Sequence, residues 1–164
     1  MSLYITTSRG FFKYSLESNK LITLISNSHK GFFKKRSKGF FGICEDKINN
    51  LILVASRENL TKSIKFEKST DVIIHFYDYK NNMSLNEITI NEIYDVHQIH
   101  MRENNLFLTD TGKNRILIYD LNTKKIKFSI NVGNKRININ HINAIYVDEN
   151  KLLIGLNNGN KNNL

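Results

Sequence analysis

The sequence predicts an all-β protein, a partial β-propeller of about three four-stranded antiparallel blades, and three observations lead to this prediction. First, residues 106–122 alternate apolar and polar side chains on both sides of an Asp-Thr-Gly-Lys-Asn turn, the pattern of two paired strands. Second, the same apolar opening returns at intervals of 46 to 55 positions, at Leu3, Leu51, Leu106 and Leu152. Third, only strand-type segments fill this period, which is typical of propeller blades and not of helical solenoids.

The remaining strands of each blade follow from this repeat. We expect an inner strand before each of three anchors, at residues 39–44, 96–101 and 141–147, and outer strands at 21–25, 85–90 and 126–130. Short polar connections between them suit hairpin turns. The predicted blades therefore cover approximately residues 1–26, 39–90, 95–132 and 141–157 of a single, incomplete domain that spans 1–164.

The predicted blades do not close a ring. A closed propeller has about four to eight blades, whereas this chain supplies only a little over three. Its open ends would present unpaired strand edges, which favour pairing with another chain. Three alternatives stay open: a fragment of a longer propeller or a truncated product, a homo-oligomer that closes the propeller, and a complete but open array. We favour the first and place homo-assembly second.

The composition indicates a globular, basic protein. The 164 residues are 40% hydrophobic, and the net charge of +9 with an isoelectric point near 9.6 favours anionic partners. The single cysteine, Cys44, excludes an internal disulfide and lies in an apolar run, so we expect an inert buried thiol in a reducing compartment. No signal peptide or membrane span of about 18 apolar residues is visible, so we expect a cytoplasmic protein without membrane contact.

One segment carries a family motif. Residues 109–116, TDTGKNRI, followed by Tyr119 and Asp120, resemble the NHL-type repeat, whose blades carry a D-x-G-N-x-R-I segment before the third strand. Residues 95–99 are similar to the inner-strand opening of NHL and gluconolactonase-like six-bladed β-propellers. The match covers one blade, about 95–132; residues 8–10 are a shortened version, and the middle blade carries a long insertion instead. The resemblance implies a propeller that binds proteins, RNA or small molecules, or that hydrolyses lactones at an axial metal.

The motif itself has a structural interpretation that needs no catalysis. Asp110 and Asn114 can cap the turn with side-chain hydrogen bonds, and Gly112 can supply a positive φ. Arg115 can pair with a neighbouring blade. We therefore expect the motif to have a structural role.

Positive charge gathers in one class of loops. In a propeller the fourth-to-first and second-to-third connections share one face, and these connections contain most of the basic residues. The candidate anion-binding residues are Lys30, Lys34, Lys35, Arg36, Lys38, Lys62, Lys65, Lys113, Lys135 and Arg136. Phe pairs interleave with them at 32–33 and 40–41, a pattern that suits nucleic acid, although core packing is the expected role of most of these rings.

Two residues form a candidate metal site. The strand alignment places His97 level with Asn143 near the propeller axis, and imidazole and oxygen ligands suit divalent cations. His97 and His100 lie three positions apart on one strand, so alternation sends them to opposite faces and they cannot bind one ion together. A divalent metal is therefore expected only as a site shared between blades, and otherwise no cofactor is expected.

The sequence thus predicts a non-catalytic binding module whose basic loop face binds an anionic partner, namely RNA, an acidic protein or a charged glycan. One alternative is a metal-dependent, lactonase-like hydrolase with His97 and Asn143 at an axial site. Another is a protein-assembly scaffold that uses its open blade edges. No nucleophile, paired-carboxylate or Gly-rich phosphate motif is visible, so no catalytic residue is assigned.

Overall fold

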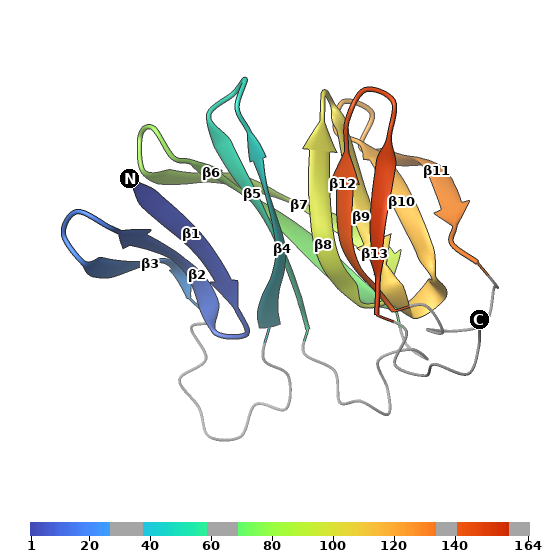
Figure 1. Cartoon of the computed structure of the whole chain (residues 1–164), viewed down its shortest axis with the longest axis horizontal. Helices are drawn as coiled ribbons and strands as arrows, with labels where there is room; N and C mark the ends of the chain where they lie inside the picture. Colours follow the sequence, from blue (N-terminus) through green and yellow to red (C-terminus); the bar gives the residue numbers. More distant parts are fainter. Residues whose placement is uncertain (27–37, 59–68, 134–140, 158–164) are drawn as a thin grey trace.

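The structure is a computed structural model that describes residues 1–26, 38–58, 69–133 and 141–157, and four antiparallel sheets follow one another along the chain (Figure 1). The first sheet holds β1 (Ser2–Thr7), β2 (Gly10–Ser15) and β3 (Lys20–Ser26). The second holds β4 (Lys38–Asp46), β5 (Leu51–Glu58), β6 (Thr70–Asp78) and β7 (Met83–Ile93). The third holds β8 (Val96–Arg102), β9 (Asn105–Asp110), β10 (Arg115–Asp120) and β11 (Lys125–Asn131), and the fourth holds β12 (Ile142–Val147) and β13 (Leu152–Leu156). The predicted fold class, an all-β partial propeller, is confirmed.

Strand ends collect at two ends of the molecule because consecutive strands run in opposite directions. At the lower end, named for its place in Figure 1, β4, β6, β8, β10 and β12 begin, at Lys38, Thr70, Val96, Arg115 and Ile142. At the upper end, short turns follow Asp46, Asp78, Asp120 and Asp148. The predicted sharing of one face by the fourth-to-first and second-to-third connections is therefore confirmed for the described strand ends.

The central strands bury both of their faces. In β5, Leu53 and Ala55 pack in the cluster shared with the third sheet, whereas Ile52 and Val54 pack in the cluster shared with the first sheet. Strands β9 and β10 repeat this arrangement toward the second and fourth sheets. Because successive side chains of a strand point to opposite faces, an almost continuous apolar run is what such a strand requires. Each fully buried aliphatic side chain contributes about 1.5–3 kcal/mol to the free energy of folding, relative to an exposed one.

Aspartates cap the turns of the upper end. The Asp46 Oδ1 accepts hydrogen bonds from two backbone N–H groups that follow it, at 3.1 and 3.2 Å. Matching bonds are made by Asp78, Asp120 and Asp148. Asn50 closes the first of these turns with a φ of 57°, a value that asparagine tolerates well. Several acidic residues of the upper end therefore have a structural role in shaping these turns.

A bulge brings neighbouring sheets together at the inner strands. The register of β4 against β5 shifts between Phe41 and Ile43, and Gly42 between them has a φ of +65°. A Cβ on Gly42 would lie only 3.0 Å from the Ile99 backbone nitrogen of β8. The side chain of Gln98 then donates a hydrogen bond to the Ile43 carbonyl, at 3.0 Å. Gly42 therefore permits the close approach of β4 and β8.

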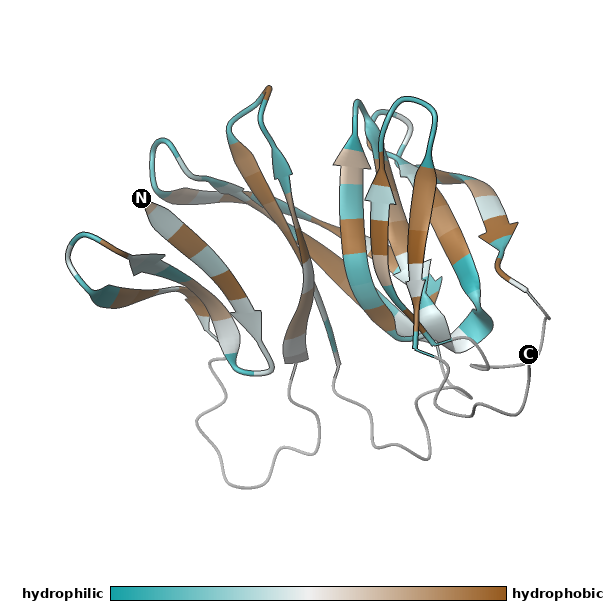
Figure 2. Cartoon of the chain, in the orientation of Figure 1, coloured by the Kyte–Doolittle hydropathy of each residue, from teal (hydrophilic) through white to brown (hydrophobic). Residues whose placement is uncertain are grey.

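The outer strands are the least buried part of the described chain. Every residue of β11 is exposed, and Phe128 has 66% of its surface accessible. Figure 2 shows the hydrophobic residues concentrated along the central strands and the polar residues at the turns. The helical content of the described residues is a single 3-10 turn, η1 (Thr111–Lys113), so no described helix has the length and apolarity to cross a membrane.

Candidate anion-binding site at the lower end

The structure describes only part of the predicted basic set. Lys113 is described completely, whereas only the backbone of Lys38, the first residue of β4, is described. The other members lie outside the described residues, namely Lys30, Lys34, Lys35, Arg36, Lys62, Lys65, Lys135 and Arg136. Their collective role as an anion-binding set therefore stays a prediction.

The described strand ends next to those segments lie together at the lower end. Segment 27–37 joins the end of β3 to the start of β4, segment 59–68 joins β5 to β6, and segment 134–140 joins β11 to β12. All six flanking strand ends belong to the lower end (Figure 1). This common location is what links Lys113 to the rest of the predicted set.

A buried ion pair joins the second and third sheets at this end. The Arg57 guanidinium, at the end of β5, pairs with the Asp95 carboxylate, and both side chains are almost completely buried. Its Nε also donates to the Val96 carbonyl at 3.1 Å, and the guanidinium stacks over the Phe41 ring, 4.0 Å from the centroid. Burial lowers the pKa of Arg57, whereas Asp95 opposes that change. The pair has a structural role, and Arg57 is not presented to solvent.

Asp110 organises the second cluster of the lower end. Its fully buried carboxylate accepts the Tyr94 backbone N–H at 2.6 Å and the Arg115 Nε–H at 2.6 Å. Arg115 also donates from Nη2 to the Glu92 carbonyl of β7, at 3.3 Å. The expected contact of Arg115 with a neighbouring blade is therefore confirmed. Burial raises the pKa of Asp110 to about 6, although Arg115 acts in the opposite direction.

The expected role of Gly112 is wrong. Its φ is not positive, and the left-handed residue of this turn is Asn114, with a φ of 49°. Gly112 is needed for space, because a Cβ there would lie 2.7 Å from both the Cβ and the carbonyl oxygen of Tyr94. Its N–H donates to that carbonyl oxygen at 2.6 Å. The turn η1 is thus fixed directly against Tyr94.

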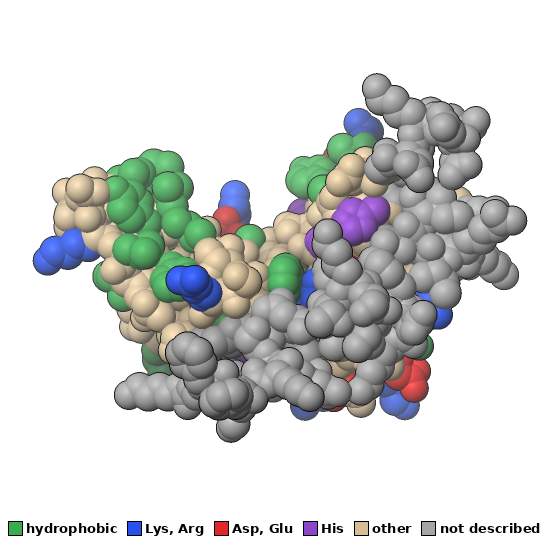
Figure 3. Space-filling view, turned by 90° about the horizontal axis from the view of Figure 1, so that it is seen from below, with side chains coloured by type: hydrophobic (Ala, Val, Ile, Leu, Met, Phe, Trp, Pro, Cys, Tyr) green, Lys and Arg blue, Asp and Glu red, His purple; other side chains and the backbone are tan. Residues whose placement is uncertain are grey.

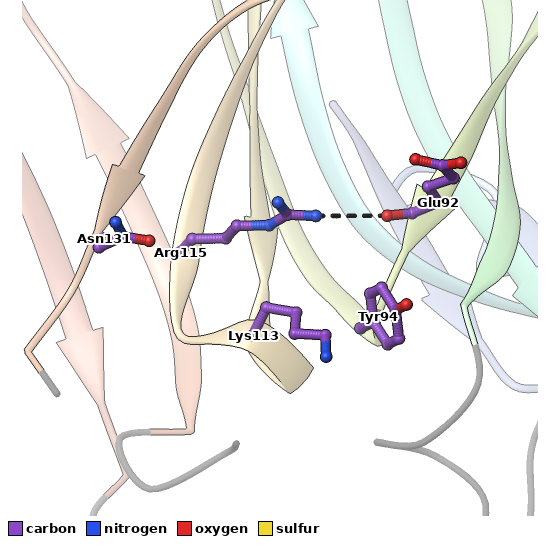
Figure 4. Close-up of a pocket in the computed structure, with 5 residues that line it drawn as sticks. All are labelled: Glu92, Tyr94, Lys113, Arg115 and Asn131. Atoms are coloured by element: carbon purple, nitrogen blue, oxygen red, sulfur yellow. Dashed lines mark hydrogen bonds between the residues drawn. The ribbon is translucent and has the colours of Figure 1, made fainter. Parts of the chain in front are cut away.

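A shallow pocket opens beside this contact. It has a volume of about 360 Å³ and is lined by Glu92, Tyr94, Lys113, Arg115 and Asn131 (Figure 4). The Lys113 Nζ lies over the Tyr94 ring, 4.3 Å from the centroid. Within the described part of the chain, Lys113 makes no hydrogen bond or ion pair, so its charge is available to an anion. Figure 4 shows the Glu92 carboxylate pointing away from Arg115, whose contact is with the Glu92 backbone.

The two candidate metal ligands lie at the lower end of neighbouring inner strands. His97 has 23% of its side chain exposed, and its Nε2 lies 3.1 Å from an Asp95 oxygen, an acidic partner that the strand alignment does not reveal. Its ring also contacts His141 edge to face, with the centroids 5.0 Å apart. Among the described residues, the buried Asn143 Oδ1 has no hydrogen-bond partner. In the described ranges, no group of three or more His, Cys, Asp or Glu is placed to hold a metal ion, and the site at His97 and Asn143 stays a prediction.

The lower end also contains a hollow. Figure 3 views this end from below and shows the surface hollowed between the first sheet and the last, with histidine side chains at the edge of the hollow.

Among the phenylalanines, Phe11 and Phe40 are buried in the core and Phe41 lies under Arg57, as expected for core rings. Burial raises the pKa of Cys44 to about 12, which fits the expected inert thiol.

Several residues that shape this site carry little signal in the sequence. From the sequence, Arg57 is one of the basic residues of the loop face, and Tyr94 and Asn131 have no expected role. A signal was present for Arg57, because it follows the apolar run 51–55 and precedes the insertion, but a single cation after a strand is normally solvated. Tyr94 has no local signal, because its importance comes from the close approach of Gly112.

Comparison with known proteins supports the fold and assigns no family. No protein-family model matches the sequence, and no curated protein matches it either. The crystal structure of Saccharomyces cerevisiae Sqt1 is similar with a TM-score of 0.57 and 10% identity, and the similarity covers 94% of this chain and 39% of that chain. The mitotic checkpoint complex gives 0.47 with 10% identity over 94% and 54% of the two chains, and Citrobacter koseri AztD gives 0.33 with 11% identity over 84% and 46%. The chain thus spans about two fifths of Sqt1 and has a β-propeller fold.

The Arg57–Asp95 pair predicts a strong effect of removing either partner. We expect Arg57→Met and Asp95→Asn each to lower the free energy of unfolding by about 3–5 kcal/mol, because the remaining group is left buried without its partner. The double variant should lose clearly less than the sum of the two. Urea denaturation measures all three, and strictly additive losses would contradict a direct interaction.

The raised pKa of Asp110 predicts a pH dependence. Because the folded-state value of about 6 exceeds the ordinary value of 3.8, the folded protein binds this proton more tightly, and its stabilising effect is lost as the pH rises through about 6. Relative to Asp110→Asn, the unmodified protein should gain about 1 kcal/mol in unfolding free energy from pH 7 to pH 5. Denaturation curves of both proteins test this, and a constant difference between them across that range would refute it.

Proposed function

We propose that this chain is a non-catalytic binding module of the NHL-like β-propeller type, and that it binds an anionic macromolecule through its lower end. The observation that carries the proposal is the different use of acidic residues at the two ends. At the upper end, Asp46, Asp78 and their counterparts accept hydrogen bonds from the backbone N–H groups of their own turns. At the lower end, Asp95 and Asp110 are buried and paired with arginines.

The buried acids therefore neutralise the arginines beside them, and the other cations of the lower end outnumber the acids that remain there, namely Glu58, Glu67, Asp71 and Glu92. These cations are Lys113 and the basic residues of the segments that leave its strand ends. The segments contain Lys30, Lys34, Lys35, Arg36, Lys62, Lys65, Lys68, Lys135 and Arg136, with Glu67 as their only acidic residue. A concentration of positive charge at one end attracts phosphate, sulfate or carboxylate groups and speeds their association.

The partner class follows from this charge. RNA, an acidic protein surface and a charged glycan all supply repeated anions, and each is a candidate partner of such a binding module. The metal-dependent hydrolase, assembly through open strand edges and a homo-oligomer that closes the propeller stay predictions, because the described residues favour none of them specifically.

The proposal predicts that loss of lower-end charge weakens polyanion binding. We expect Lys34→Gln/Lys35→Gln/Arg36→Gln to lower the affinity for a single-stranded RNA 12-mer at least tenfold at low salt. The slope of log K against log salt should fall in magnitude by about 2, because each neutralised phosphate contributes about 0.7. Fluorescence anisotropy at several salt concentrations measures both quantities.

A matched control removes the same charge from the upper end. Lys47, Lys80 and Lys151 are exposed residues of its turns, and the triple Gln variant at these positions should bind within twofold of the unmodified protein. Equal losses in the two triple variants would mean that only net charge matters, and the proposed binding end would be wrong.

A further inference from the structure

We propose that the pocket of Tyr94, Lys113, Arg115 and Asn131 is a nucleotide subsite, in which Lys113 and Arg115 hold a phosphate while the Tyr94 ring packs against the adjoining base. This inference rests on the proposed function and deepens it, because it selects single-stranded RNA among the three anionic partners. The subsite is built entirely from described residues (Figure 4).

The charge of the pocket fits one phosphodiester. Asp110 neutralises Arg115, and the Glu92 carboxylate points away, so the uncompensated charge is the single ammonium of Lys113. A phosphodiester carries one negative charge, as does each internal phosphate of an RNA chain. Arg115 adds direction, because Nε and Nη2 are engaged and its other N–H groups, on a side chain 28% exposed, can donate to phosphate oxygens.

Arg115 and Tyr94 are held in place before a ligand binds, and Lys113 is the group that must turn. Arg115 is held at two points, by Asp110 and by the Glu92 carbonyl. Tyr94 is held by its N–H, which donates to Asp110, and by its carbonyl oxygen, which accepts the Gly112 N–H at 2.6 Å. A site whose side chains are already oriented loses less conformational entropy on binding.

The aromatic ring distinguishes the partner classes. A nucleobase has a flat π face that can pack on Tyr94, whereas a sulfated glycan or an acidic side chain has none, and base–aromatic stacking contributes substantially to binding of single strands. The Lys113 ammonium that lies over the ring would turn toward the phosphate and leave that ring face to the base. The pocket volume of about 360 Å³ is close to the minimum of the range of about 300–1,000 Å³ for small-ligand sites. A pocket of this size suits one nucleotide.

Residues beside the pocket lead directly to two of the predicted basic segments. Asn131 lines the pocket and pairs with Arg115, and segment 134–140 begins three residues further along the chain. Thr70, which follows segment 59–68, pairs with Ile93 directly before Tyr94. An RNA chain held in the pocket would therefore lie between the start of β6 and the end of β11, which are the strand ends next to two predicted basic segments.

The test compares two ligands and two variants. Tyr94→Leu should lower the affinity for a single-stranded RNA 12-mer about tenfold and leave that for a heparin-type sulfated oligosaccharide within twofold, because only the base uses the ring. Lys113→Gln should weaken the binding of both ligands and lower the magnitude of the slope of log K against log salt for RNA by about 0.7. Tyr146→Leu, at an exposed tyrosine of β12, is the matched control and should change neither affinity.

A crosslink provides a measurement that needs no variant. RNA with 4-thiouridine, irradiated with the unmodified protein, should mark the tryptic peptide 81–102 that carries Tyr94, and a crosslink confined to other peptides would overturn the subsite. A nucleoside monophosphate that competes in a Tyr94-dependent manner would support the subsite with a free nucleotide as its source. Competition only by oligomers would support it with an RNA chain as the source.

The outcomes separate this inference from the proposed function. If Lys34→Gln/Lys35→Gln/Arg36→Gln weakens RNA binding and Tyr94→Leu does not, the nucleotide subsite is wrong and the binding end stands. If Tyr94→Leu weakens RNA and the sulfated oligosaccharide equally, the pocket holds anions without recognising bases, which also overturns the subsite. If the unmodified protein binds no polyanion, both proposals fail.

Discussion

The buried carboxylate of Asp110 is the interaction on which the lower end depends. It joins the connection between β7 and β8 to the start of β10, because it accepts the Tyr94 N–H and the Arg115 guanidinium together. A buried charge is tolerated only when it is paired and hydrogen-bonded, so Tyr94 and Arg115 must keep their places as long as Asp110 is ionised. The geometry of the pocket is a direct consequence of this requirement.

The same principle connects the sheets and the charge distribution. Arg57 and Asp95 form a second buried pair between β5 and the start of β8, and they too remove an acid from the surface of the lower end. Together with Asp110 and Arg115, this pair holds adjacent sheets together at the lower end. On the proposed function, the residues that hold adjacent sheets together would also determine which charges a partner meets.

The sequence was sufficient for the fold and only partly sufficient for the site. Short apolar runs such as 51–56, which recur along the chain, identify strands, and burial on both faces explains why these runs are almost continuously apolar. The role of Gly112 could not be predicted, because its constraint is the approach of Tyr94 and not a local backbone angle. The acidic partner of His97 was also hidden, since Asp95 lies two residues away and reaches the ring through a φ of 69°.

The most direct test of the proposed binding end is an NMR titration of the isotope-labelled protein with a single-stranded RNA 12-mer. If RNA binds at the lower end, the amide signals of Tyr94, Gly112 and Val132 should shift, while those of the upper turns 46–50 and 78–82 should stay in place. Shifts confined to the upper turns, with the lower-end amides unchanged at saturation, would contradict the account.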